Sequence, residues 1–271
     1  MRILRLGVTF LFALVLVFYV LFRIQQLNVD RTYPQITVDS DMLYVTIDAD
    51  REELLAGVAA YDEKDGDLTH KIIVESISRF KEPGVSIIKY AVCDNDNHVS
   101  SVKRMLTYTN YAPPKFTLSD SLVFGVSQNI NIRNILGAVD LIDGDISGKV
   151  IITADEYASN VEGVFYISAK ATNSKGDMIS LQLPVYVEEM SLSAPKIDLH
   201  DYLVYVRCGE TYQVSDNIRS ARDAQDADLR SSVQIDTNLD TDTPGIYEAH
   251  YRVTDAFGRT GHEILTIIVA E

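Results

Sequence analysis

The strongest constraint on the fold of this chain is an acidic motif that occurs three times. It reads DEKDGD at 62–67, DLIDGD at 140–145 and DAQDAD at 223–228, so successive copies are 78 and 83 residues apart. Repetition at a fixed period indicates that one structural unit is encoded several times. The chain of 271 residues has room for three such units.

Each copy continues with the same order of strand and turn signals. A glycine stands 19 or 20 residues after the middle aspartate of the motif, and an Asp or Asn follows ten residues later. Alternate positions between them are apolar, which is typical of a strand with one face in a core. These core positions are Ile88, Tyr90 and Val92 in the first copy, Ile167, Ala169 and Ala171 in the second, and Ala249, Tyr251 and Val253 in the third.

A hairpin turn is predicted just after each of these strands. The residue three positions beyond the Asp or Asn is Asn97, Gly176 or Gly258, and these residue types tolerate a left-handed backbone. Helical periodicity is scarce in the repeats, and 51–61 is predicted to form one helical turn at most. Short strands separated by turn residues predict antiparallel β-sandwiches.

The start of the chain is apolar. The segment from Leu6 to Phe22 runs seventeen residues without a charge, the lower limit for a membrane-spanning helix. A cleaved signal peptide is the alternative, but 22–27 lack the small residues of a cleavage site. We therefore predict an uncleaved membrane anchor over 6–22.

The positive-inside bias sets the predicted orientation of that anchor. Arg2 and Arg5 precede it and Arg23 follows it, which predicts a cytoplasmic N-terminus at 1–5 and a juxtamembrane linker at 23–32. The prediction is thus a single-pass protein of the cell membrane with the bulk of the chain extracellular.

Charge and cysteine content restrict the partners and the chemistry. Beyond Arg23 the chain holds 21 basic and 39 acidic residues, a net charge of −18, whereas nucleic-acid binding needs clustered Lys and Arg. We predict no nucleic-acid partner. Cys93 and Cys208 are far apart in sequence and are predicted to be unpaired thiols, with a bridge between repeats as the alternative.

The repeats resemble a bacterial immunoglobulin-like family of exported and surface proteins, the type named after the Ig-like domain of a pesticidal crystal protein. Its pattern, A-x-D-x-x-D-G-D-[LI]-[TS] and then P-G-x-Y-x-[VI]-x-Y-x-V-x-D-x-x-G, is nearly complete in AYDEKDGDLT and PGVSIIKYAVCDNDN of the first copy. The second copy has AVDLIDGDIS and EGVFYISAKATNSKG, and the third has ARDAQDADLR and PGIYEAHYRVTDAFG. The departures from the pattern are Ser86, Asn97, Asn173 and Ala227.

This resemblance implies the fold and leaves the activity open. We predict an all-β chain of three tandem immunoglobulin-like antiparallel β-sandwiches, preceded by one transmembrane α-helix. The domains are predicted at 33–110, 111–189 and 190–271, named below the first, second and third repeat. Domains of this family resemble spacers, adhesion modules and accessory domains, and one fold serves many functions.

The acidic motif has two interpretations. In one, the aspartates accept hydrogen bonds from the amides of their own turn while the glycine supplies a positive φ. In the other, three carboxylates and a carbonyl supply about half of the six to eight oxygens that calcium needs. Calcium is the one cofactor considered, and its candidate ligands are Asp62, Asp65, Asp67, Asp140, Asp143 and Asp145.

No motif of an enzyme is apparent. Paired carboxylates can act as general acid and base, but here they recur three times at turns. No G-x-S-x-G, H-E-x-x-H or Gly-rich phosphate loop occurs. The histidines are interpreted as ordinary exposed or half-buried residues; they are His70, His98, His200, His250 and His262.

The predicted function is therefore non-enzymatic. We expect a membrane-anchored bacterial surface protein whose repeats mediate adhesion or bind a protein or cell-wall glycan. The alternatives are a structural spacer or assembly subunit of a membrane complex, and a calcium-stabilised rod. The densest aromatic group of the third repeat, Tyr202, Tyr205 and Tyr212, is expected in core or edge packing.

Overall fold

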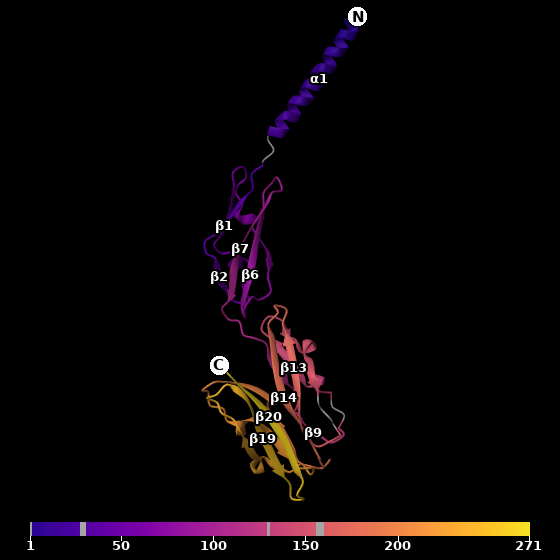
Figure 1. Cartoon of the computed structure of the whole chain (residues 1–271), viewed down its shortest axis with the longest axis vertical. Coiled ribbons are helices and arrows are strands. Elements are labelled where there is room, and N and C mark those ends of the chain that lie inside the picture. Colours follow the sequence, from indigo (N-terminus) through magenta and orange to yellow (C-terminus); the bar gives the residue numbers. More distant parts are fainter. Residues whose placement is uncertain (1, 28–30, 129–130, 156–159) are drawn as a thin grey trace. The chain divides into compact units, whose positions relative to one another are not determined.

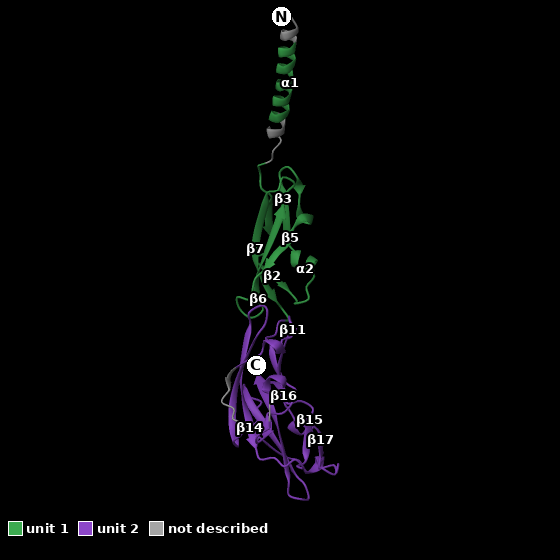
Figure 2. Ribbon diagram, turned by 90° about the vertical axis from the view of Figure 1, so that its right-hand side faces the viewer, with its two compact units in different colours: residues 1–110 green, residues 111–271 purple. Residues whose placement is uncertain are grey.

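The computed structural model describes residues 2–27, 31–128, 131–155 and 160–271 (Figure 1). Its contacts divide the chain into two compact units, Met1–Asn110 and Tyr111–Glu271 (Figure 2). The first repeat lies in the first unit, and the second and third repeats together make up the second.

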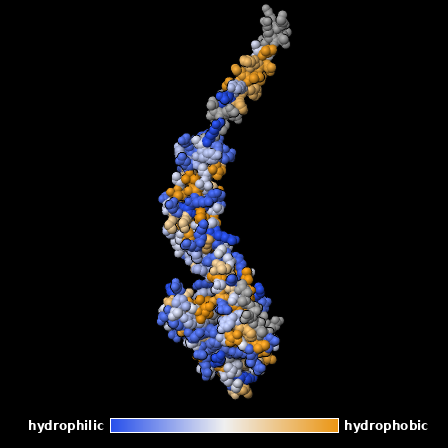
Figure 3. Space-filling view, in the orientation of Figure 1, coloured by the Kyte–Doolittle hydropathy of each residue, from blue (hydrophilic) through white to orange (hydrophobic). Residues whose placement is uncertain are grey.

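The chain begins with helix α1 (Arg2–Leu27), whose apolar side chains from Val8 to Phe22 are exposed (Figure 3). Among the described residues, no helix is long and apolar enough to span a membrane. The predicted anchor between Leu6 and Phe22 is therefore wrong, and so is the single-pass location with a cytoplasmic N-terminus. An uncharged run of seventeen residues extends about 26 Å as a helix, less than the ~30 Å hydrocarbon core of a bilayer.

Two sheets form the first repeat. The smaller has the order β1-β3-β4 and the larger has the order β2-β7-β6-β5. A capping box between Asp50 and Glu53 starts the single turn of α2, as predicted for this segment. The bounds are β1 Gln35–Val38, β2 Met42–Val45, α2 Arg51–Leu55, β3 Val58–Asp62, β4 Gly66–Asp67, η1 Thr69–Lys71, β5 Ile73–Ile77, β6 Val85–Cys93 and β7 Val99–Tyr108.

The second repeat has the same plan, with the sheets β11-β10-β8 and β12-β13-β14-β9. In the third repeat, the sheets are β15-β17 and β16-β20-β19-β18. The bounds in the second repeat are β8 Lys115–Leu118, β9 Val123–Gly125, η2 Ile132–Asn134, β10 Leu136–Asp140, β11 Gly144–Asp145, η3 Ser147–Lys149, β12 Ile151–Asp155, β13 Gly163–Thr172 and β14 Met178–Glu188. Those in the third are β15 Lys196–Leu199, β16 Leu203–Arg207, η4 Val214–Asn217, β17 Ile218–Arg222, η5 Arg230–Ser232, β18 Gln234–Thr237, β19 Gly245–Thr254 and β20 Thr260–Ala270.

Antiparallel sheets were predicted, but each larger sheet also contains one parallel pair of strands. In each larger sheet the second strand of the repeat pairs in parallel with the last one: β2 with β7, β9 with β14 and β16 with β20. The reason lies in the start of each repeat, where two short strands in succession join different sheets. The second of them runs in the same direction as the final strand.

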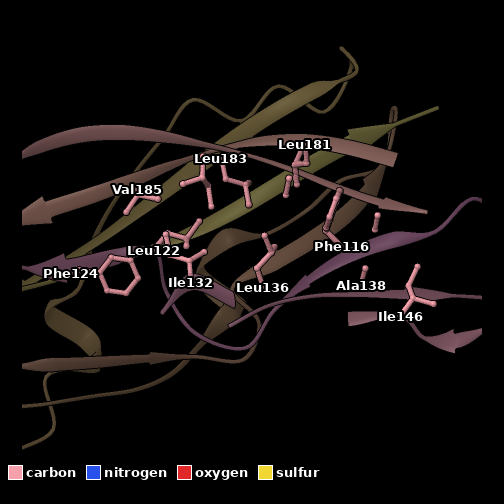
Figure 4. Packing of buried hydrophobic residues seen from close by; sticks show 13 residues of the cluster. Phe116, Leu122, Phe124, Ile132, Leu136, Ala138, Ile146, Leu181, Leu183 and Val185 are labelled. Atoms are coloured by element: carbon pink, nitrogen blue, oxygen red, sulfur yellow. The ribbon is translucent and has the colours of Figure 1, made fainter. Parts of the chain in front are cut away.

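Each pair of sheets encloses its own hydrophobic cluster. In the second repeat, Leu181, Leu183 and Val185 of β14 face residues of the smaller sheet and the loops around it (Figure 4). The alternating residues predicted to face a core, such as Ile88, Tyr90 and Val92, are at most 2% exposed. Outside α1 and the short helical turns, the described residues form β-sheets, so the prediction of a mostly β structure is confirmed.

Candidate functional site

The first aspartate of the acidic motif is buried and holds its own turn. Asp62 is 2% exposed, and its Oδ1 accepts the main-chain amides of Lys64 at 2.9 Å and Asp65 at 3.0 Å. Asp140 has the same role in the second repeat, with the amides of Ile142 at 3.0 Å and Asp143 at 2.8 Å. This is the turn geometry of the first interpretation.

The middle aspartate ties this turn to the hairpin turn about thirty residues later. The carboxylate of Asp65 accepts the main-chain amide of Asn95 at 2.7 Å and its side-chain amide at 2.8 Å. In the second repeat, Asp143 accepts the amide of Ser174 at 2.7 Å and its hydroxyl at 2.6 Å. We call each of these bonded turn pairs a turn clasp.

Lysine completes the clasp of the second repeat. The Nζ of Lys149 lies 2.7 Å from Oδ2 of Asp143. Hydrogen bonds from Lys149 and from Ser174 stabilise the carboxylate and hold the pKa of Asp143 below its usual value, against a smaller effect of burial.

The last aspartate of the motif caps a short 3₁₀ turn. Asp67 accepts the amide of Thr69 and Asp145 accepts that of Ser147, both at 2.9 Å. Hydrogen bonds from the same Thr and Ser lower the pKa of both carboxyls. The residue after each aspartate, Leu68 or Ile146, is 2% exposed and fills the core.

The calcium interpretation requires carboxylates that converge on one point. In the part of the chain that the structure describes, no group of three or more His, Cys, Asp or Glu side chains is placed to hold a metal ion. The three carboxylates of each motif accept bonds from different amides instead. Calcium at Asp62, Asp65, Asp67, Asp140, Asp143 and Asp145 stays a prediction.

The third repeat keeps the turn and changes the clasp. Asp223 accepts the amides of Gln225 at 2.9 Å and Ala227 at 2.8 Å. Asp226 occupies the middle position with φ of 67° and pairs at 3.0 Å with Arg222 on the surface. Its side chain is 81% exposed, against 14% for Asp143.

A second cluster lies where the second and third repeats meet. Tyr186 and Glu188 come from β14, and Glu248, His250 and His262 come from β19 and β20. The Nδ1 of His262 lies 3.0 Å from Oε1 of Glu188, and its Nε2 lies 3.1 Å from Nδ1 of His250. The Nε2 of His250 lies 3.4 Å from Oε2 of Glu248, which also accepts the hydroxyl of Tyr186 at 2.8 Å.

The electrostatics of this cluster favour charged carboxylates. The hydrogen bond from His262 lowers the pKa of Glu188 more than burial raises it. Burial raises the pKa of Glu248, but the bonds from His250 and Tyr186 together leave it below its usual value. Burial, and then the contact with Glu248, raises the pKa of the Tyr186 hydroxyl.

This cluster was not predicted from the sequence, because each histidine was interpreted separately. Since Ala249, Tyr251 and Val253 face the core, Glu248 and His250 must face away from it, on the opposite side of the same strand. The available signal was an acidic residue two positions before a histidine on the outer face of one strand. Nothing in the sequence indicated that β14 of another repeat covers that face.

The tyrosines of the third repeat lie in packing positions, as expected. Tyr202 and Tyr212 pack against the core of the third repeat. The hydroxyl of Tyr205 accepts the main-chain amide of Phe116 at 2.8 Å, and the Nζ of Lys115 lies 4.9 Å from the centre of its ring. Tyr205 thus joins the third repeat to the second.

A family model described as "Bacterial surface protein, Ig-like domain" matches residues 201–269. The third repeat is therefore similar to bacterial surface Ig-like domains. This match supports the resemblance that the paired motifs carry. The matched residues include the strands from β16 to β20, which hold both histidines of the cluster.

Two curated proteins are similar to this chain in sequence. The pesticidal crystal protein Cry22Aa of Bacillus thuringiensis is 34% identical over 133 residues, which are 48% of this chain and 17% of Cry22Aa. An uncharacterised 81.3 kDa protein of Acholeplasma phage L2 is 22% identical over 243 residues, 85% of this chain and 33% of that protein. The chain thus spans a third or less of the length of these relatives.

Solved structures resemble the chain only weakly. One contains the M60 catalytic domain with two CBM51 domains of ZmpB from Clostridium perfringens, at 15% identity and a TM-score of 0.26, and covers 89% of this chain and 31% of its own. Another is human CDH23 EC21-23, at 13% identity and a TM-score of 0.22, covering 88% of this chain and 100% of its own. At these scores the similarity indicates neither a shared ligand nor a shared activity.

Proposed function

We propose that this chain is a non-enzymatic bacterial surface protein whose three repeats are tandem immunoglobulin-like sandwiches that bind a protein or a wall polymer. The observation that carries the proposal is the family match of the third repeat. The first two repeats have the same acidic turn and the same parallel pair of strands in the larger sheet. The surface location of that family supports a role in adhesion.

The chemistry of the acidic turns supports a role without catalysis. A general acid or base needs a carboxyl that is available to a substrate. The carboxylates of Asp62 and Asp140 instead accept two amides each from their own turns, and those of Asp65 and Asp143 hold the turn clasps. These groups stabilise the fold.

The first repeat carries an exposed apolar surface that suits a binding role. Met42 and Met105 are register partners on β2 and β7, and they are 41% and 43% exposed. Tyr44 is 61% exposed and its hydroxyl contacts the sulfur of Met42 at 3.5 Å. Methionine and tyrosine side chains together form an adaptable contact surface, here named the Met–Tyr strip.

A binding assay with the whole protein tests this proposal. The labelled chain is titrated onto cells and isolated wall polymer of the bacterium that encodes it, beside a variant with Met42→Ser, Tyr44→Ser and Met105→Ser. We expect saturable binding, which the triple variant weakens at least about tenfold, a loss of ~1.4 kcal/mol.

The control variant is Val99→Ser, which replaces a 58% exposed apolar residue of the same strand β7 outside the strip. It should bind as the natural chain does. Absence of saturable binding to cells and to wall polymer would refute the adhesion proposal and favour a structural spacer. Equal binding by the triple variant would show that the Met–Tyr strip is not the binding surface.

A further inference from the structure

We propose that the second and third repeats are joined by a proton-dependent clamp, in which His250 and His262 take up one proton as Glu188 docks against them. The clamp consists of Tyr186, Glu188, Glu248, His250 and His262. Its consequence is that this junction is closed at mildly acidic pH and opens more often as the pH rises.

The contacts within the clamp need more protons than two neutral imidazoles carry. Three links run through the clamp, from Glu188 to His262, from His262 to His250, and from His250 to Glu248. The first two links are hydrogen bonds, and the third, at 3.4 Å, becomes an ion pair only when His250 carries a proton on Nε2. Each therefore needs one N–H, since a carboxylate can only accept. Two neutral imidazoles supply two N–H groups. The clamp is therefore one proton short, and some nitrogen lone pair must face an oxygen or the other ring.

One additional proton satisfies every link of the clamp, and a second additional proton does not fit. With three protons, both carboxylates receive a donor and the two rings share one N–H···N bond. With four, the two facing nitrogens would both carry hydrogen at a separation of 3.1 Å. The ring planes are only 16° apart, so the facing N–H groups could not avoid each other. The clamp holds a single extra proton.

Binding of this proton is linked to the docking of the second repeat against the third. Glu248 belongs to the same repeat as the histidines, whereas Glu188 belongs to β14 of the second repeat. Docking therefore adds one carboxylate, 3.0 Å from His262, to a cluster that otherwise has one. A nearby negative charge favours the protonated form of an imidazole. By linkage, the bound proton must favour docking to the same degree.

Burial makes the link strong enough to matter. His262 is 4% exposed, so water does not replace a missing partner at its ring. Unpaired polar groups cost more inside a protein than on its surface. An ordinary imidazole changes its charge between about pH 5 and 8, so the test covers this range.

Other charges around the clamp modify this effect without reversing it. Arg252 lies directly across the strand pair from His262 and opposes its protonation, but its side chain is exposed and screened. Tyr166 of β13 lies near Tyr186. The other groups that line a cavity with His262 are Asp120, Lys196, Asp198 and Glu263, and burial raises the pKa of Glu263 to about 8. If opening exposes Glu263 to water, it releases its proton, which favours opening at higher pH in the same direction as the clamp.

Contacts outside the clamp keep the repeats near each other when the proton is absent. Leu203 and Ile268 of the third repeat pack against the core of the second, and Tyr205 accepts the amide of Phe116. We therefore expect a shift between closed and open forms of one chain. The proton changes their ratio.

The test measures the opening equilibrium in the full chain. Dyes are attached at Lys170→Cys and Asp236→Cys, two exposed positions in different repeats, with Cys93 and Cys208 replaced by serine. Energy transfer is recorded between pH 5.5 and 8.5. Each proton linked to opening makes the opening constant rise with pH by as much as about tenfold per unit, and Glu263 contributes beside the clamp, so the share of the clamp is the difference from Glu188→Gln.

Glu188→Gln is the decisive variant, because it keeps the shape and removes the docked charge. Its opening constant should rise less steeply than that of the natural chain, by as much as about tenfold per pH unit, and His250→Gln should behave likewise. Glu189→Gln, an exposed neighbour outside the clamp, should keep the full dependence. Overturning results are a flat response of the natural chain or an unchanged response in Glu188→Gln. Circular dichroism confirms that each variant is folded.

Discussion

The carboxylate of Asp143 accepts both the main-chain amide and the hydroxyl of Ser174, 31 residues further along the chain, at 2.7 and 2.6 Å. These bonds join the acidic turn to the β13–β14 hairpin turn. Because the two turns come from the smaller and the larger sheet, the clasp holds together two sheets that share no ladder. It contributes to the stability of the second repeat.

Asp143→Asn should therefore destabilise the protein. The substitution removes the charge that strengthens the bonds from Ser174 and Lys149, and a bond to a charged partner contributes about 1.5–3 kcal/mol. We expect the free energy of unfolding to fall by about 1–2 kcal/mol, measured by urea denaturation of the transition that includes the second repeat.

The third repeat supplies a matched control. Asp226 occupies the same position in its motif but pairs only with Arg222 on the surface. Asp226→Asn keeps a residue type that tolerates the φ of 67° there. Its unfolding curve should overlay that of the natural chain. An equal loss of unfolding free energy in both variants would mean that the turn clasp adds no stability beyond that of the acidic turn.

The clasp should also weaken at low pH. The pKa of Asp143 is lowered in the folded protein by its bonds to Lys149 and Ser174. A carboxyl with a depressed folded pKa stabilises the protein above its unfolded pKa of about 3.9, and this stabilisation is lost as the pH falls through the folded pKa. The difference in unfolding free energy between the natural chain and Asp143→Asn should thus be full at pH 7 and shrink below about pH 4. A difference that is constant from pH 7 to pH 3 would contradict this role.

The sequence predicted those features that local residue patterns determine. The alternation at Ile88, Tyr90 and Val92 identified a core face, and the spacing of the aspartates identified turns. The parallel pairing of β2 with β7 was missed because residue patterns carry no record of which sheet a strand joins. The error at 6–22 arose because seventeen uncharged residues stand at the lower limit of a membrane span.

The site could be predicted only within a single repeat. Asp62 and Asp140 hold their turns as the sequence implied, since an Asx turn depends on neighbours two and three residues away. His262 meets Glu188 across 74 residues of chain, and this contact depends on how two repeats pack. Repetition of a motif indicates the unit and says nothing of the surface by which units join.

Calcium should leave the stability of the protein unchanged. The carboxylates of the predicted ligands Asp62, Asp65 and Asp67 accept different main-chain amides, and the one bound by Asp65 lies in the hairpin turn. A ligand that binds only the native state adds about 2.7 kcal/mol at a hundredfold excess over its Kd. We expect equal melting temperatures in EDTA and in millimolar calcium. A higher Tm in calcium that Asp65→Asn removes would instead establish a calcium site in the first repeat.

Gly261→Ala should destabilise the third repeat through a direct collision. Gly261 lies in β20, and a Cβ built there would meet the main-chain carbonyl oxygen of Pro195, at the start of the repeat. Because the new Cβ would meet main-chain atoms, no flexible side chain can move aside to make room for it. Overpacking of this kind costs about 1–3 kcal/mol, so the urea midpoint of the third repeat should fall. Gly148→Ala is the control, because a Cβ at Gly148 has nothing within 4 Å. If both variants unfold at the same urea concentration, the close approach of β20 to Pro195 is refuted.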